Sequence, residues 1–542
     1  MKAIPQLLVL LFCLKALSPL QAQSAYLQLD KPYYFNGEYI FYTFFLGEVK
    51  TDSAVLLLRL VKEGEVLDQH YQANDEGFTG GYFKLAHELR SGIYEIQAFA
   101  FDKKNGSPID LFNTPISIFG EDSPSKKPAH FISSNSPPLP DRNSAIQLRF
   151  KTDDAPESVL TSCTIQALPE GSSQLSIAIR KLREETHLLS NIRYFQHELD
   201  VRSCVSQLPI LGYKSRLDSA SSESALIYAF QARSLLFQLA SMDSNRNVPI
   251  EFPRMYGPSE IQFLDFFLSR PAQLEPFTIP PPEKSEHIKI KDASISAEYL
   301  LLQKRKQIFQ LFHQLPHQVI AENSALRQKL PEADFEVDVQ DYAVKGKLSD
   351  LFSEFVSPLN FRKKKGVDPI RVYYRFKGKP IYHKFPPLFV VNGIATQDAD
   401  FICSLLLQEI KTVHVYSEPE TLGAIVGSYN IGGLVVLDLV DPLFKLPEEL
   451  SLPGMKIPGL QLPIIYPIKG EMESETPRIQ SLLYWSPHHA LESENQVQLT
   501  FPTPDLFGKY CLDMLIQDSR GKVYVESIPL LFEENVWRRI GN

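Results

Sequence analysis

Cysteine is scarce in this chain, and the few cysteines form no recognisable motif. Five are present. Cys13 lies in an N-terminal stretch that resembles a cleavable export signal, which leaves Cys163, Cys204, Cys403 and Cys511. No two of these four have CxxC spacing, so the pattern excludes a redox CxxC motif and a zinc site built from such pairs. Export permits disulfides, and the three full pairings of the four cysteines stay open. Cys403, within FICSLLLQEI, is expected to lie in a buried helix.

Basic residues are outnumbered, with 55 Lys and Arg against 64 Asp and Glu and a net charge of −9. A chain this acidic attracts phosphate poorly, so nucleic acid is not an expected partner. One local exception is FRKKKG, with the basic run Arg362–Lys365. We favour a solvated turn for this run, and a patch that binds anions or lipid headgroups is the alternative.

Familiar catalytic motifs are missing as well. GxSxG and the Walker A loop do not occur, so the simplest serine-hydrolase and nucleotide-binding interpretations have no support. SPHHALESE contains His488, His489, Glu492 and Glu494, but adjacent histidines point in different directions and HExxH is lacking, so we expect a solvated loop. We therefore predict no catalytic residue, no metal ligand and no cofactor. Paired carboxylates of a glycoside hydrolase cannot be recognised by spacing, so a secreted hydrolase stays open.

No apolar run reaches the roughly 20 residues that a membrane-spanning helix needs. The run Leu7–Leu14 follows Lys2 and precedes small residues near Ala22, an order typical of a signal peptide. We therefore expect export from the cytoplasm and no transmembrane segment in the mature chain.

Strand patterns dominate what is present. At 542 residues the chain is too long for one core, and three to five domains are expected. YIFYTFFLG, AVLLLRLV and SGIYEIQAFAF have the length, composition or alternation of strands, with NDEGFTGG as a predicted turn cluster. Several short strands joined by such turns favour a β-sandwich.

Three pieces of this N-terminal segment carry a family resemblance: DKPYYFNGE (Asp30–Glu38), NDEGFTGG and LRSGIYEIQAF. In this order and spacing, the segment resembles the second macroglobulin-type domain of the α2-macroglobulin superfamily. The thioester run Cys-Gly-Glu-Gln of the protease-trapping members is absent, so covalent trapping of proteases is disfavoured. Reversible, thioester-free engagement of proteases stays open.

A second specific pattern occurs near the middle of the chain. PLFVVNG (Pro387–Gly393), LLLQEIKTVHVYSEPETLGAIVG and NIGGLVVLDL (Asn430–Leu439) predict strand, turn, helix, strand, glycine turn and strand, a small α/β domain with a mixed sheet. This unit resembles the plug domain of TonB-dependent outer-membrane receptors. About 100 residues follow it, whereas a receptor barrel of roughly 22 strands needs well over 200 residues. We therefore expect a plug-like domain without its barrel.

The expected fold class is multidomain and mainly β, with macroglobulin-type sandwiches, the small plug-like α/β domain and a short helical segment. Two stretches of the middle region are interpreted as helices, SALIYAFQARSLLFQLA and the amphipathic SAEYLLLQKRKQIFQLFHQL. The expected units are a signal peptide (1–22), a sandwich (23–120), a Pro/Ser-rich linker (121–144), a second sandwich (145–210), an irregular and helical region (211–335), the plug-like domain (336–442), a Pro-rich connector (443–476) and a C-terminal β domain (477–536).

This domain order resembles a family of secreted Bacteroidota proteins. The resemblance implies this architecture and a location in the periplasm or at the outer membrane. Together with the export signal and the lack of catalytic motifs, the domain order favours a non-enzymatic binding or scaffold protein whose protein partners include an outer-membrane barrel complex. The candidate interaction surface is formed by Asn392, Gly393, Tyr429, Asn430, Gly432 and Gly433. The alternatives are the secreted hydrolase, acting on polysaccharide or peptide through a site between domains, and the protease-binding macroglobulin relative. Convergent polar groups in a concave site would indicate the hydrolase, whereas flat apolar or strand-edge patches would indicate the scaffold.

Overall fold

The computed structural model is multidomain and mainly β, as the sequence predicts. The residues it describes are 23–46, 54–74, 77–102, 108–120, 129–130, 146–152, 160–166, 168–169, 172–182, 192–197, 213–215, 226–232, 235–241, 247–248, 250, 256–257, 259–265, 274–276, 291–292, 332–341, 346–354, 356–361, 369–427, 431–444, 446–447, 449–452, 454–457, 459–461, 482–491, 496–504, 507–519, 522–533 and 536–539.

The first sandwich consists of two sheets, built from strands within residues 23–119 and one strand from residues 192–197. One sheet has the order β13 (Ile192–His197), β1 (Gln23–Leu29), β3 (Tyr39–Leu46), β6 (Phe78–Lys84). The other has the order β2 (Tyr33–Phe35), β8 (Pro108–Phe119), β7 (Gly92–Phe101), β4 (Ala54–Lys62), β5 (Glu65–Asn74). Alternate residues such as Leu27, Tyr42 and Phe44 fill the core between the sheets. The intervening Phe41 and Phe45 are also buried, so this sheet is covered on both faces.

Two expectations about this segment are corrected. β13, expected in the second sandwich, pairs instead with β1. FTGG of the predicted turn cluster lies inside strand β6. Its glycines are explained by close contacts, because a Cβ on Gly80 would lie 2.6 Å from Pro487 and one on Gly81 would lie 2.3 Å from the Tyr42 hydroxyl.

The second sandwich is built from two distant parts of the chain. One sheet has the order β10 (Gln147–Thr152), β11 (Leu160–Gln166), β31 (Gln496–Pro502). The other has the order β30 (Leu482–Ala490), β12 (Ser172–Lys181), β32 (Gly508–Asp518), β33 (Val523–Glu533), β34 (Val536–Arg539). The segments expected as a second sandwich and a separate C-terminal domain therefore form one domain with one core. Periodicity identifies strands, but it does not identify the strands that they pair with.

A third β unit occupies the region expected to be irregular and helical. Its larger sheet has the order β16 (Leu236–Ser241), β15 (Leu226–Gln231), β18 (Ser259–Asp265), β29 (Gly454–Ile457). A small sheet has the order β17 (Asn247–Val248), β14 (Tyr213–Ser215), β19 (Leu274–Pro276). β9 (Ala129–His130) pairs with β20 (Lys291–Asp292).

The helix expected for SALIYAFQARSLLFQLA is wrong, because β15 and β16 form an antiparallel hairpin there. Its strands lack polar alternation since both faces are covered: Ile227 and Ala229 belong to one core, and Tyr228 and Phe230 belong to another. The expected Pro-rich connector also contributes structure. β29 pairs with β18, and Gln461 bonds through its side chain to Gln72 and to the backbone of Tyr82.

The α/β domain has the mixed sheet that the sequence predicts, in the order β21 (Phe335–Asp338), β27 (Ile410–Tyr416), β28 (Leu434–Leu439), β25 (Leu388–Val391), β26 (Ile394–Thr396). β25 and β28 are parallel, and the other neighbours are antiparallel. The remaining elements are η4 (Val339–Asp341), α3 (Leu348–Glu354), β22 (Leu359–Phe361), β23 (Ile370–Phe376), β24 (Lys379–Tyr382), α4 (Ala399–Ser404), η5 (Leu407–Glu409) and α5 (Pro419–Val426).

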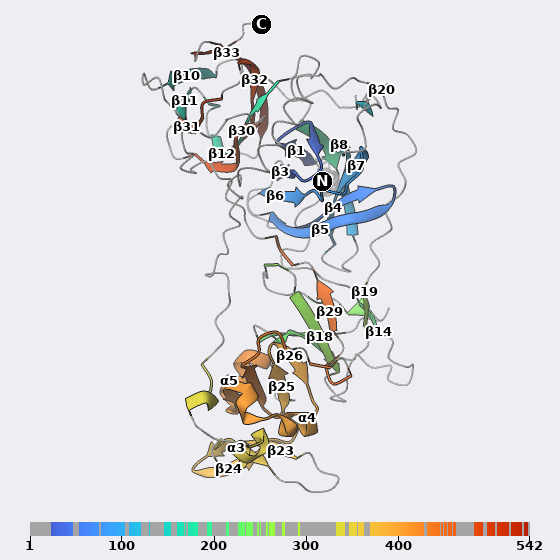
Figure 1. Ribbon diagram of the computed structural model, residues 1–542, viewed down its shortest axis with the longest axis vertical. Helices are drawn as coiled ribbons and strands as arrows, with labels where there is room; N and C mark the ends of the chain where they lie inside the picture. Colours follow the sequence, from blue (N-terminus) through green and yellow to red (C-terminus); the bar gives the residue numbers. More distant parts are fainter. Residues whose placement is uncertain are drawn as a thin grey trace, which may run out of the picture.

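Within the described residues, six sheets follow one another along the molecule with a hydrophobic core between each neighbouring pair. We call this arrangement the sheet stack; Figure 1 shows the two sandwiches at one end and the α/β domain at the other. The order of the sheets is β10-β11-β31, β30-β12-β32-β33-β34, β13-β1-β3-β6, β2-β8-β7-β4-β5, β16-β15-β18-β29 and β21-β27-β28-β25-β26. The modules are thus joined by buried apolar surface, which resists hinge motion between them.

Several predictions fall outside the described residues: the signal peptide 1–22, most of the linker 121–144, the helix at 296–315, Cys204 and the basic run 362–365. Cys163 and Cys511 are buried thiols, and Cys403 lies in α4 as expected but is only partly buried. In the part of the chain that is described, no helix combines the length and hydropathy needed to cross a membrane.

Candidate functional site

Asn392 and Gly393, the first two residues of the predicted surface, form the two-residue turn between β25 and β26. Their φ angles are 46° and 81°. Asn and Gly adopt this left-handed conformation most readily, and it gives the hairpin its favoured turn. The Asn392 amide donates to the carbonyl of Asp441 at 2.9 Å, and its side-chain oxygen accepts from the N–H of Leu439 at 2.9 Å. The turn therefore holds the end of β28 and remains partly exposed.

Gly432 and Gly433 do not contribute to an exposed surface, so this part of the prediction is wrong. Both are buried immediately before β28. A Cβ on Gly432 would lie 1.6 Å from the carbonyl oxygen of Phe385, and one on Gly433, at φ 118°, would lie 2.6 Å from the Val372 side chain. These glycines allow close backbone packing, which no other residue would permit. Tyr429 and Asn430 lie outside the described residues.

The predicted residues also lie at opposite ends of the sheet. Gly432 and Gly433 precede β28, whereas the Asn392–Gly393 turn lies beside the residues that follow it. A strand of six residues spans about 20 Å. The Asn392–Gly393 turn and the glycines Gly432 and Gly433 therefore cannot belong to one contact surface.

One end of this sheet does carry an exposed apolar surface. Val440 and Leu443, which follow β28, are 52% and 83% exposed. Leu443 is held by a hydrogen bond from its N–H to the carboxylate of Asp441, whose carbonyl accepts from Asn392. We call Asn392, Gly393, Val440 and Leu443 the strand-end surface. Sequence reasoning missed Val440 and Leu443; the available signal was VDPLF, apolar residues around a proline at the end of a predicted strand.

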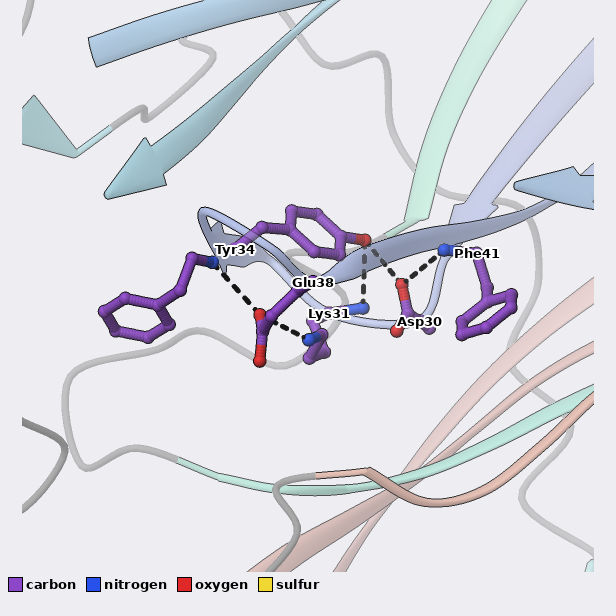
Figure 2. Close-up of polar contacts among 6 residues, drawn as sticks. Asp30, Lys31, Tyr34, Glu38 and Phe41 are labelled. Carbon is purple, nitrogen blue, oxygen red and sulfur yellow. Dashed lines mark hydrogen bonds and ion pairs between the residues drawn. The ribbon is translucent and has the colours of Figure 1, made fainter. Parts of the chain in front are cut away.

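The DKPYYFNGE segment folds into a buried polar corner between β1 and β3 (Figure 2). The Tyr34 hydroxyl donates to Asp30 Oδ1 at 2.6 Å, and the N–H of Phe41 donates to the same oxygen at 3.0 Å. Lys31 Nζ lies 2.7 Å from Glu38 Oε2, which also accepts from the N–H of Phe35 at 3.0 Å. The charged side chains thus satisfy backbone groups of a tight chain reversal.

Burial controls the electrostatics of this corner. Loss of hydration raises the pKa of Asp30 from 3.8 to about 6, although the Lys31 charge and the bonds from Tyr34 and Phe41 lower it. Burial and the adjacent Asp30 carboxylate raise the pKa of the Tyr34 phenol well above its usual value. Both residues are fully buried, so no substrate reaches them. The corner stabilises the sandwich rather than supplying a reactive group.

A second buried ion pair lies where the two sandwiches meet. Arg180 Nε on β12 lies 2.6 Å from Asp513 Oδ2 on β32, and both side chains are at most 2% exposed. Asp513 also accepts from the Ser527 hydroxyl and the Cys511 thiol, and Gln28 of the first sandwich donates to its carbonyl. Burial raises the pKa of Cys511 well above its usual value, so its thiol is not a nucleophile.

His70 and His488 pack against aromatic rings. His70 Nε2 lies 2.7 Å from the Tyr42 hydroxyl inside the first sandwich, and burial lowers its pKa to about 3, which keeps it neutral. His488 and His489 were expected in a solvated loop but belong to β30, where His488 stacks on Phe78 with ring centroids 4.2 Å apart. Across the residues described here, no three His, Cys, Asp or Glu side chains are arranged to hold a metal ion.

Comparison with known proteins gives distant structural matches. No family model and no curated protein sequence matches the chain. A methylamine-treated Salmonella α2-macroglobulin is 7% identical with a TM-score of 0.23, covering 94% of this chain and 39% of its own. Native Escherichia coli α2-macroglobulin is 9% identical with a TM-score of 0.24, covering 95% and 40%. A tetra-tandem repeat from a large adhesion protein is 10% identical with a TM-score of 0.15, covering 47% and 73%. The chain thus spans about two fifths of the length of these macroglobulins, and the scores are too low to transfer a function.

Proposed function

We propose that this chain is a non-catalytic, protein-binding relative of the macroglobulins that acts as a scaffold in the bacterial cell envelope. The observation that carries the proposal is the strand-end surface, an exposed apolar patch mounted on a continuous sheet stack. The DKPYYFNGE corner and the export-type N-terminus support the macroglobulin relationship and the envelope setting.

The sheet stack gives the strand-end surface a fixed position. The hairpin β15–β16 connects the first sandwich to the α/β domain through buried side chains. Ile227 packs toward the first sandwich, and Phe230 packs toward the α/β domain. Gln262 on β18 adds polar contacts, since its side chain accepts from the N–H of Ala395 at 2.7 Å and donates to the carbonyl of Leu452 at 3.1 Å. A preorganised surface loses little conformational freedom when a partner binds.

The chemistry of the strand-end surface suits a protein partner. Leu443 is 83% exposed, and Val440, three positions earlier in the chain, is 52% exposed. Exposed apolar side chains beside well-positioned backbone groups are typical of protein contact sites. The expected partner is therefore a protein with a complementary apolar patch.

Affinity purification from gently solubilised envelopes of the native organism tests this proposal. The wild-type chain should retain a stable companion, and V440S/L443S should lose it. The matched control is Phe507→Ser, which removes another exposed apolar side chain, 57% exposed, in the second sandwich. Recovery of the wild-type chain alone, or equal recovery of a companion by V440S/L443S, would contradict the proposal.

A protease panel tests the macroglobulin relationship in the same preparation. If the partners include proteases, native gels should show a complex that dissociates in denaturant, because no thioester is present to trap the protease covalently. Persistence of a complex in denaturant would contradict the reversible mechanism.

A further inference from the structure

A second exposed surface lies on the hairpin formed by β23 and β24, at the α/β end of the molecule in Figure 1. Lys377 and Gly378 form its turn, with φ angles of 50° and 78°. The eight consecutive residues 375–382 are all exposed. A Cβ on Gly378 would meet no atom within 4 Å, so the turn projects from the fold.

This hairpin concentrates positive charge in an acidic chain. Residues 370–384 contain no Asp or Glu, whereas the whole chain has a net charge of −9. The cations are Arg371, Arg375, Lys377, Lys379 and Lys384, all exposed. Within the described part of the chain, none of the five forms an ion pair. Their charges therefore remain available to an anionic partner.

Apolar side chains alternate with these cations. Phe376 is 56% exposed, Tyr382 is 42% exposed and Ile381 is 38% exposed. Tyr374 pairs with Ile381 and Phe376 pairs with Lys379, so Phe376 and Ile381 lie on one face of the hairpin. A projecting turn with an aromatic and an aliphatic side chain flanked by lysines has the composition of segments that enter a membrane interface.

We propose that the β23–β24 hairpin docks on a membrane surface rich in anionic lipid headgroups. Phe376 and Ile381 enter the interface, while Lys377, Lys379 and the neighbouring arginines contact the headgroups. This inference concerns a surface separate from the strand-end surface, so it holds whether or not a protein partner is found there.

Two other anionic or extended partners fit the hairpin less well. An added peptide strand would pair with β24, the edge of the β22-β23-β24 sheet, but Pro380 removes a donor from this four-residue strand. A soluble polyanion would use the cations and leave Phe376 and Ile381 in water. A lipid surface satisfies both kinds of side chain.

The first sandwich supplies a matched control hairpin. β4 and β5 are joined by Glu63 and Gly64, whose φ angles of 51° and 89° give the same kind of turn. Val66 and Leu67 are 37% and 38% exposed there, but the charges of Lys62, Glu63, Glu65 and Asp68 around this turn sum to −2. Exposed apolar residues with a net negative charge around them should not bind an anionic membrane.

Vesicle co-sedimentation of the purified chain tests the proposal. The chain should bind vesicles of equimolar phosphatidylcholine and phosphatidylglycerol, should not bind phosphatidylcholine alone, and should dissociate as salt is added. K377Q/K379Q should weaken binding about 30-fold, from about 1 kcal/mol per surface lysine. Phe376→Ser should weaken it about tenfold through lost apolar burial. V66S/L67S should bind like the wild type.

Three results would overturn the proposal. The first is no binding to the anionic vesicles, and the second is equal binding of wild type and K377Q/K379Q. The third is full competition by soluble polyglutamate together with unchanged binding of Phe376→Ser, which would assign the hairpin to a soluble polyanion. Each variant should keep the wild-type thermal unfolding midpoint, since the changed side chains are exposed.

Discussion

Replacing Asp30 by Asn should remove a specific pH dependence of stability. Asp30 is fully buried, and its pKa is raised from 3.8 to about 6, mainly by desolvation. A carboxyl whose pKa is higher in the folded state stabilises the fold when protonated. This stabilisation is complete below about pH 4 and is lost as the pH rises through about 6. Asn cannot ionise, so the stability of the D30N variant should not show this decrease over the same pH range.

The magnitude follows from the pKa difference. A rise from 3.8 to about 6 is slightly more than two pH units, and each unit corresponds to about 1.4 kcal/mol, which gives about 3 kcal/mol. In D30N the side-chain oxygen of the new amide can keep the bonds from Tyr34 and Phe41. The amide nitrogen takes the place of Asp30 Oδ2, which has no hydrogen-bond partner. This replacement changes the free energy of unfolding of D30N by an amount that does not vary with pH.

Urea unfolding of wild type and D30N at several pH values measures the effect. The chain has two tryptophans, and Trp485 packs with Phe41, the residue whose N–H bonds to Asp30. In a Trp537→Phe background, Trp485 fluorescence therefore reports on this part of the sandwich. Between about pH 4 and pH 7 the wild type should lose about 3 kcal/mol relative to D30N. Parallel stability curves for the two proteins would refute the reasoning. Tyr34→Phe removes a hydrogen bond to the ionised carboxylate, which raises the folded-state pKa of Asp30 further. The midpoint of the stability loss should therefore move to higher pH.

Three further predictions concern buried positions. Arg180→Met should lower the free energy of unfolding by about 3–5 kcal/mol, because it leaves the Asp513 carboxylate buried without its cation; denaturant titration checks this, and a loss below about 1 kcal/mol would contradict it. Gly432→Ala should cost about 3 kcal/mol or more, since its Cβ would overlap the carbonyl oxygen of Phe385; unchanged thermal unfolding would be inconsistent with the close approach. Burial raises the pKa of Cys163 to about 12, so its thiol should resist maleimide labelling at neutral pH until the chain unfolds, and rapid labelling of the native protein would argue against this burial.

The sequence predicted the strands of the first sandwich and most of the α/β domain well. These elements have clear local signals, such as the alternation of SGIYEIQAFAF and the Asn392–Gly393 turn, which the structure confirms. Helix α5 was missed, although Pro419 at its start and Gly427 after its end are ordinary helix boundary signals.

Long-range pairing and burial were harder to predict. The hairpin β15–β16 was interpreted as a helix because strands covered on both faces lose the polar alternation that marks an ordinary strand. Gly432 and Gly433 were assigned to a surface because glycine signals a turn as readily as a close backbone approach. The sequence does not predict that the expected second sandwich and the expected C-terminal β domain form one domain, since no local pattern identifies the strand with which another strand pairs. The cations of β23 and β24 are evident in the sequence, but only the structure shows that their side chains are exposed.

The second sandwich has a consequence for the order of events during synthesis. Arg180 and Asp513 are 333 positions apart, so β12 leaves the ribosome long before its neighbours β30 and β32 exist. Until then β12 offers unpaired edges and apolar side chains that invite aggregation, a situation in which a holding chaperone is useful. Closure of this domain is therefore a late step that joins strands from residues 146–182 to strands from residues 482–539. A truncated product would leave residues 146–182 without their core.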